Sequence, residues 1–186
     1  MAERLRNVGK PSEWARVGIV YQDQYLLLLR DAVRYPDGSL GTYIRSVDQY
    51  PGMVGVVILP MYKDHVLLIR HFRHATRTWH LELPRGFGQT VTTEEDAQRE
   101  LAEEINGTAT RLISLGKVYP DTGASSEQVA LFYAEVETYG EGELMEAITA
   151  VLPTSLPEFE RMIRENEISD GFTLMAYARA KTLNLL

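Results

Sequence analysis

The sequence contains no cysteine among its 186 residues. Disulfide scaffolds, thiolate zinc sites and thiol nucleophiles are therefore excluded. Basic residues are in the minority, because 19 Lys and Arg stand against 26 Asp and Glu, giving a formal net charge of -7 and a pI near 5.2. A chain of this charge does not hold nucleic acid by bulk attraction to a basic face.

Long apolar runs are also missing. The longest nearly unbroken run, residues 52–61, is far shorter than the roughly 20 residues that a membrane-spanning helix needs. The polar and basic residues 1–12 are followed by no apolar stretch of the signal-peptide type. We therefore expect a cytoplasmic protein with neither a membrane nor a nucleic-acid partner.

What the chain does contain is typical of a well-packed globular protein, with 45% hydrophobic and 24% charged residues. No repeat, biased segment or clean linker divides it. We expect a single domain over residues 1–186, made of an N-terminal β subregion at about 12–50 and a core at about 51–186.

Runs of β-branched and aromatic residues predict strands. Three of them, separated by turn residues, predict an N-terminal antiparallel sheet, and the later ones predict a sheet core. The predicted strands are residues 17–20, 25–30, 42–47, 54–59, 65–72, 112–119 and 128–136.

Helix signals occur at three places. Thr92 and Glu95 form a capping box, and Asn106 provides a left-handed stop, which predicts a helix over residues 93–105. A second capping box at 155–158 predicts a helix to about 165, and Asp170 caps a last helix to about 183. Strands and helices in this order predict an α+β fold, an α/β/α sandwich.

The first predicted helix carries Asp96, Glu100, Glu103 and Glu104 on one stripe beside its apolar face. Like charges four residues apart destabilise a helix by about 0.2–0.5 kcal/mol per pair, so something must offset the repulsion. Magnesium takes oxygen ligands and bridges carboxylates to phosphates. The Gly/Pro loop at 82–88 lets backbone approach a phosphate. The alternative is a solvated helix face, which is commoner for a random run of Glu.

Taken together, Arg99-Glu100-Leu101-Ala102-Glu103-Glu104 and the glycine Gly86 before them resemble the Nudix hydrolase box. Three positions depart from that pattern. Gly86 lies thirteen residues before Arg99 instead of fourteen, Val91 replaces a glutamate thought to brace the box, and Asn106 replaces a glycine.

The resemblance extends over most of the chain and is strongest to the branch that hydrolyses ADP-ribose and related nucleoside diphosphate sugars. The segments that carry it are 34–38, 41–43, 70–73, 79–84 and 168–170. It implies a Nudix fold with a mixed β-sheet between helices, an N-terminal antiparallel sheet and a homodimer. A proline expected about fifteen residues past the box is absent at Thr122, so ADP-ribose is favoured but not fixed.

The resemblance also implies the site. The metal, magnesium with manganese as the alternative, would be held by the Arg85 carbonyl and by the helix glutamates Glu100, Glu103 and Glu104. The catalytic residues would be Glu127, which orients or deprotonates water, with Glu104 and Glu103. The small-molecule nucleotide would contact residues from two strands and the loop: Arg70, Arg73, Glu82, Arg85 and Gly86.

Each of these assignments has an alternative. The three arginines are equally compatible with diphosphate pairing and with a surface position. Glu127 without the resemblance is an exposed strand-start residue. His71, His74 and His80 do not have the spacing of a zinc site. A Nudix-fold sensor that binds a nucleotide without cutting it is the competing function, and a partner-binding module comes third.

Overall fold

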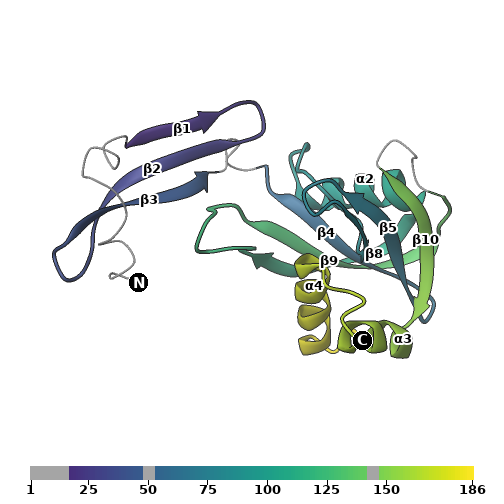
Figure 1. Cartoon of the computed structure of the whole chain (residues 1–186). Helices are drawn as coiled ribbons and strands as arrows, with labels where there is room; N and C mark the ends of the chain where they lie inside the picture. The colour runs from purple at the N-terminus through teal and green to yellow at the C-terminus, as the bar shows by residue number, and fades with distance from the viewer. Residues whose placement is uncertain (1–16, 48–52, 142–146) are drawn as a thin grey trace. The chain divides into compact units, whose positions relative to one another are not determined.

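The computed structural model describes residues 17–47, 53–141 and 147–186. The chain folds into two compact units. One comprises residues up to Pro51 together with Asp121–Glu127, and the other comprises Gly52–Pro120 and Gln128–Leu186. Figure 1 shows the elements of both units along the chain.

The N-terminal unit contains a three-stranded antiparallel sheet, in the order β1-β2-β3. Its first turn is held by Asp23, whose carboxylate accepts from the backbone N–H groups of Tyr25 and Leu26. Its second turn contains Gly38 at φ +82°, a region that favours glycine. The predicted N-terminal antiparallel sheet is confirmed, with the bounds β1 Gly18–Gln22, β2 Leu27–Arg34 and β3 Leu40–Val47.

The second unit contains a seven-stranded mixed sheet with the path β10-β5-β4-β9-β8, to which β6 adds beside β5 and β7 beside β4. β4 and β9 are parallel, and the other pairs are antiparallel. The bounds are β4 Gly55–Tyr62, β5 His65–Arg73, β6 Thr78–Glu82, β7 Arg85–Gly86, β8 Thr108–Val118, β9 Val129–Thr138 and β10 Ile148–Ser155.

The strands predicted in this unit are confirmed as β4, β5, β8 and β9. β6 and β7 were not predicted, and neither was β10. Its sequence includes Pro153, which reads against a strand because proline cannot donate a ladder hydrogen bond. β10 lies at the edge of the sheet, where it pairs with β5 alone. An edge strand tolerates proline because one side of its backbone needs no partner.

Three helices are present in the described residues: α2 Thr93–Ile105, α3 Leu156–Arg164 and α4 Gly171–Thr182. The Thr92 hydroxyl accepts from Glu95 N–H at 3.2 Å, and the Asp170 carboxylate accepts from Thr173 N–H at 2.9 Å, which confirms both predicted caps. At α3 the capping box is wrong, since Ser155 makes no side-chain cap bond. Pro157 in the first turn has no N–H to be capped and favours the helical φ.

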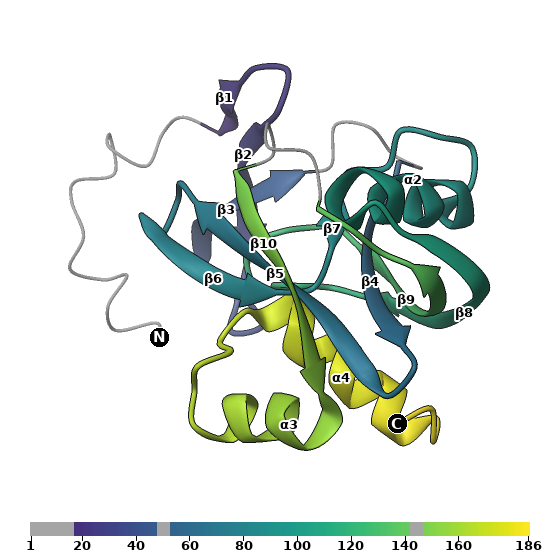
Figure 2. The same cartoon turned by 90° about the vertical axis from the view of Figure 1, so that its right-hand side faces the viewer.

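The central strands carry apolar side chains on both faces. On β4, Val57 and Leu59 pack in one cluster with α3 and α4, whereas Val56 and Ile58 pack in a second cluster with α2. The near-continuous apolar sequence of this strand follows from burial on both sides. Helices therefore cover both faces of the sheet, as Figure 2 shows, and the predicted α/β/α sandwich is confirmed.

Among the described residues, no helix combines the length and the apolar character needed to cross a membrane.

Candidate active site

The loop that leads into α2 is anchored to the sheet. β7, made of Arg85 and Gly86, pairs with Val57 and Val56 of β4. Just before it, the Pro84 carbonyl accepts from the N–H of a β4 residue, Ile58, at 2.9 Å. The central strand therefore fixes the backbone from which Arg85 was predicted to offer a carbonyl to metal.

The acidic stripe of α2 faces the interior. Asp96, Glu100 and Glu104 are 1%, 5% and 2% exposed, whereas the Glu103 side chain is 39% exposed. The alternative of a solvated helix face is therefore wrong for the three buried carboxylates. Buried charges need partners, because their removal from water is otherwise unfavourable.

One arginine supplies part of that compensation. The Arg99 guanidinium lies 2.7 Å from Glu100, 2.6 Å from Glu103 and 3.4 Å from Asp96. It also donates to the carbonyl of Phe87 in the preceding loop at 2.8 Å. Arg99 thus offsets repulsion within the stripe and links the helix to the loop.

Glu104 has a different environment. Its carboxylate accepts from the backbone N–H of Arg85 at 2.9 Å, and no Lys, Arg or His of the described ranges forms an ion pair with it. Burial and the charge of Glu100 raise the pKa of Glu104 to about 8, although the Arg85 N–H opposes the shift. Negative charge at this position is therefore poorly compensated by the protein itself.

The absence of a side chain at Gly86 leaves room for the Glu100 carboxylate. A Cβ atom at residue 86 would lie 1.8 Å from one carboxylate oxygen of Glu100, closer than any real contact. With the Glu100 side chain in this position, residue 86 has no room for a Cβ atom.

Glu100 and Glu104 fit a divalent cation. Both are hard oxygen donors, they are buried one helical turn apart, and they lie against the backbone of Arg85 and Gly86. In the part of the chain that the structure describes, no three His, Asp or Glu side chains are already arranged around a metal position. Glu103 pairs with Arg99 instead, so its predicted metal and catalytic roles require a reoriented side chain.

Glu82, predicted to bind substrate, is completely buried at the end of β6. Arg73 donates to its carboxylate, and Arg85 Nη2 and His71 Nδ1 lie 3.6 and 3.3 Å away. Burial raises the pKa of Glu82, but these contacts outweigh it and hold the pKa below its ordinary range. Glu82 is thus an ionised centre that orients two of the arginines predicted to bind phosphate.

The side chain of Arg85 points toward the start of α4. Its Nη2 lies 3.6 Å from Asp170, the N-cap of that helix, and its guanidinium lies 4.5 Å from the ring centre of Phe172. Arg85 therefore joins the loop to α4. Its predicted contact with substrate stays a prediction.

Arg70, the remaining predicted phosphate ligand, lies over an aromatic side chain. Its guanidinium is 4.3 Å from the Trp79 ring centre, and Nη1 donates to Thr149 Oγ1 at 3.4 Å. Trp79 is 40% exposed, so this cation–π pair lies at the surface. Binding of substrate by Arg70 and Arg73 stays a prediction.

Comparison with known proteins identifies the family. The NUDIX domain model matches residues 51–173, which is more than half of the chain. The chain belongs to the Nudix family. An ADP-ribose pyrophosphatase of Bacillus subtilis (strain 168) is 25% identical over 167 residues, covering 86% of this chain and 85% of that protein. A solved structure described as an ADP compounds hydrolase is 21% identical, with a TM-score of 0.76 over 91% of each chain.

These matches confirm the resemblance proposed from the sequence. The Nudix fold, a mixed sheet between helices, is present, and the enzyme class is that of a Nudix pyrophosphohydrolase. The matched region includes the loop, α2 and its glutamates.

Two departures from the Nudix box now have physical explanations. Asn106, at the position of a glycine, has φ 46° and ψ 41°, the left-handed conformation in which asparagine is the best substitute for glycine. Val91, at the position of the bracing glutamate, is 96% exposed. A longer acidic side chain there would face water, so the loop must be held in another way.

Glu127, the predicted catalytic base, belongs to the N-terminal unit. The loop before it is bound to the end of β3. Ser46 N–H donates to the Ala124 carbonyl at 2.8 Å, Ser126 N–H donates to the Ser46 carbonyl at 3.3 Å, and Tyr43 Oη donates to the Gly123 carbonyl. The catalytic role of Glu127 stays a prediction.

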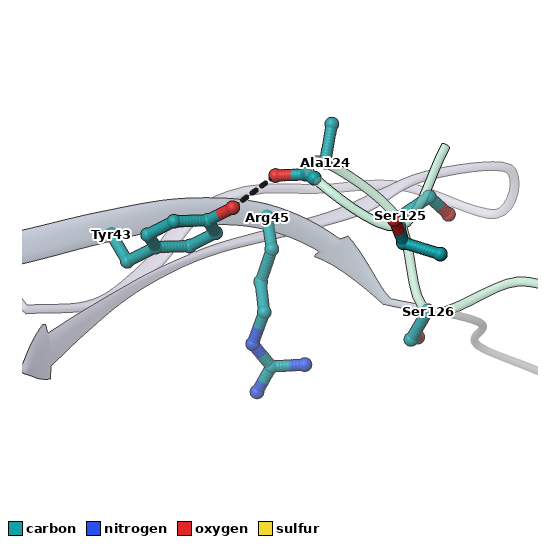
Figure 3. Close-up of a pocket in the computed structure, with 7 residues that line it drawn as sticks. Tyr43, Arg45, Ala124, Ser125 and Ser126 are labelled. Carbon is teal, nitrogen blue, oxygen red and sulfur yellow. Dashed lines mark hydrogen bonds between the residues drawn. The ribbon is translucent and has the colours of Figure 1, made fainter. Parts of the chain in front are cut away.

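The same loop and β3 line a surface pocket of about 230 Å³. Figure 3 shows Tyr43 and Arg45 opposite the loop residues, with the Tyr43 hydrogen bond dashed. Arg45 Nε lies 2.6 Å from Asp31. The pocket is lined by Tyr43, Arg45, Thr122, Gly123, Ala124, Ser125 and Ser126.

Asp96 and Arg99 have contacts on α2 that were not predicted from the sequence. The spacing of Arg99 from Asp96 and Glu103, three and four positions along one helix, is the signal that predicts its ion pairs. Asp96 has no comparable signal, because its contacts depend on the conformation of the loop before α2.

Proposed function

We propose that this Nudix pyrophosphohydrolase cleaves the pyrophosphate bond of a nucleoside diphosphate linked to another group, with ADP-ribose as the substrate and magnesium, or manganese, as the cofactor. The observation that carries this proposal is the pair Glu100 and Glu104, which are buried against the Arg85–Gly86 backbone, together with the raised pKa of Glu104. Similarity to an ADP-ribose pyrophosphatase supports the choice of substrate.

The proposed reaction forms a bond from the water oxygen to one phosphorus and breaks the bond from that phosphorus to the bridging oxygen. ADP-ribose would give AMP and ribose 5-phosphate. A dication held by Glu100, Glu104, the Arg85 carbonyl and a reoriented Glu103 would supply charge neutralisation and a more acidic water. Glu127 would take the proton of the attacking water.

The guanidinium groups that surround Glu82 have a part in this proposal. Arg73 is held by Glu82, so its remaining donors are limited in orientation and suit a phosphate oxygen. Arg70, stacked on Trp79, would contact the second phosphate or the linked group. Gly86 would contact the diphosphate through its backbone, because the Glu100 carboxylate fills the space beside its Cα atom.

A substrate panel tests the proposal. The chain is incubated with ADP-ribose, nucleotide sugars, dinucleoside polyphosphates and oxidised nucleotides, each with magnesium, with manganese and with EDTA. Phosphomonoester products are then measured after phosphatase treatment. We expect the highest kcat/KM for ADP-ribose, and we expect no hydrolysis of any substrate in EDTA. Thermal stabilisation by ADP-ribose without product would instead support a nucleotide sensor.

We propose further that the protein is a homodimer that buries the N-terminal sheet. A small sheet needs a covered hydrophobic face to be stable, and large apolar residues gathered in solvent mark an interaction surface. The exposed large side chains of this unit are Val17, Ile19, Val20, Tyr21, Tyr25, Leu26, Leu40, Tyr43 and Ile44.

Light scattering after size exclusion tests the dimer. Ile19→Lys, at a position 64% exposed, is expected to shift the mass toward the monomer. Leu183→Lys is the matched control, because Leu183 is also exposed, at 50%, but lies outside this sheet. A monomeric wild type would contradict the proposal. The cytoplasmic location and the absence of nucleic-acid and membrane partners stay predictions.

A further inference from the structure

The loop before α2 lacks the support that the box pattern leads one to expect. It is one residue short, and Val91, where the bracing glutamate would stand, is 96% exposed. Yet this loop begins at Arg85 and Gly86, whose backbone lies against Glu104 and Glu100. Another group must therefore hold residues 87–92 in place.

Asp96 has the contacts of such a group. It is 1% exposed, in the first turn of α2, and its Oδ1 accepts from the backbone N–H groups of Gln89 at 2.9 Å and Thr90 at 3.1 Å. Two hydrogen bonds from successive backbone amides to one carboxylate fix the path of the loop. A carboxylate in the first helical turn is also favoured by the helix dipole.

Asp96 is connected to the glutamates through one side chain. Arg99 Nη2 lies 3.4 Å from Asp96 Oδ1 and 2.7 Å from Glu100, and it donates to the Phe87 carbonyl at 2.8 Å. Arg99 Nη1 lies 2.6 Å from Glu103. Asp96 therefore binds both the loop and the arginine that holds two predicted metal ligands.

We propose that Asp96 is a positioning residue, which braces the shortened loop against α2 and thereby sets the geometry of Glu100 and of the Arg85 carbonyl for the divalent cation. This inference rests on the proposed function for its consequence in catalysis, but the contacts themselves do not depend on it. Asp96 touches neither substrate nor cation and acts through the loop backbone and Arg99.

Substitution of Asp96 by Asn tests the brace. The amide keeps the shape and one acceptor oxygen for Gln89 and Thr90, but it loses the negative charge that strengthens these bonds and the ion pair with Arg99. Glu95→Gln is the matched control, because Glu95 is the neighbouring residue of the same turn, is exposed and undergoes the same change of charge. Both variants are compared with wild type at a temperature well below the lowest Tm.

Two readouts are measured. The first is the magnesium concentration for half-maximal hydrolysis of ADP-ribose, and we expect Asp96→Asn to raise it about tenfold or more, which corresponds to about 1.4 kcal/mol of binding free energy. The second is hydrogen exchange of the peptide that contains Gln89 and Thr90, which we expect to be faster in Asp96→Asn. Glu95→Gln should change neither.

The outcomes separate the inference from the proposed function. If wild type hydrolyses no substrate, the proposed function fails, and the midpoint of manganese binding replaces that of hydrolysis for testing Asp96. Faster exchange with an unchanged metal midpoint, or no change in either readout, would overturn the inference. If Asp96→Asn does not fold, Asp96→Glu is used instead, and a metal midpoint equal to that of wild type together with faster exchange would again overturn it.

Discussion

Two buried glutamates of the same unit lie in opposite electrostatic environments. Glu82 is surrounded by Arg73, Arg85 and His71, and these contacts keep its pKa below the ordinary range. Glu104 receives one backbone N–H from Arg85 and lies near Glu100, and its pKa is raised to about 8. Burial alone therefore does not define a functional carboxylate. What distinguishes Glu104 is that no basic side chain in the described part of the chain forms an ion pair with it, and a cation would supply that charge.

The largest effect on turnover is expected from Glu104→Gln. The amide oxygen still accepts from Arg85 N–H, but the negative charge for the cation is lost, and turnover should fall by about 100-fold or more. Steady-state release of phosphomonoester measures the change. The metal-free Tm should not fall, because the substitution removes an unfavourable buried charge. Wild-type turnover would show that the comparison with Glu82 has no functional meaning.

Glu82→Gln should lower the free energy of unfolding, which Glu104→Gln should not. It leaves Arg73 and Arg85 without their countercharge, and removing one partner of a buried ion pair costs about 3–5 kcal/mol. Urea unfolding measures the loss in free energy of unfolding. Glu158→Gln, which breaks an exposed pair with Arg161 on α3, serves as the control and should leave the urea midpoint unchanged. A midpoint for Glu82→Gln equal to that of wild type would contradict the assigned structural role.

The pH dependence of stability should separate the two sites. Because the folded pKa of Glu104 is raised from 4.5 to about 8, the metal-free protein binds an extra proton between these values and loses stability as pH rises through that window. The loss is at most about 1.4 kcal/mol per pH unit. The lowered pKa of Glu82 acts in the opposite direction, since its stabilisation is lost as pH falls below the ordinary range.

Urea unfolding in EDTA at pH 5.5, 6.5 and 7.5 measures this dependence. The slope of the free energy of unfolding against pH should become shallower with magnesium, because the cation favours the ionised carboxylate. The slope should also be smaller in Glu104→Gln than in wild type. A slope that is the same in wild type and Glu104→Gln would assign it to other groups.

The smallest effect is expected from Asn106→Ala, which changes the end of α2 without touching a charge. Alanine at a positive φ should cost about 1 kcal/mol in free energy of unfolding. Asn106→Gly should be neutral or stabilising, since glycine adopts this conformation without strain. Turnover of both variants at low temperature should stay close to wild type. If either Asn106 variant lost as much turnover as Glu104→Gln, the effect of Glu104→Gln would have to be attributed to disruption of α2.

Local signals in the sequence predicted most of the fold. The bounds of α2 follow from its cap at Thr92, its apolar spacing and the stop at Asn106, all of which are short-range effects. β6, β7 and β10 were not predicted. In β10, Pro153 removes one ladder donor, which the edge position of the strand tolerates, and edge position is a property of the whole sheet. Ser155 is the N-cap of α3, as predicted, but the capping hydrogen bond that its sequence pattern predicts is not made.

The candidate site was predictable in its residue types and less so in its contacts. The carboxylate stripe follows from helical spacing, but its burial depends on the loop that packs against it. The direction of the Arg85 side chain, toward Asp170, depends on a helix that lies 85 residues later in sequence. Such contacts join elements distant in the chain, for which no short motif exists.

The connection between β8 and β9 contributes Asp121–Glu127 to the unit built by the first strands. A chain begun at Gly52 would keep α2 and its glutamates but would lose Ser46 and Tyr43, which receive and supply the hydrogen bonds of that connection. The N-terminal strands thus provide hydrogen-bond partners for the connection between β8 and β9. A library that varies residues 121–127 should therefore include the end of β3, because Ser46 and Tyr43 hydrogen-bond to that connection.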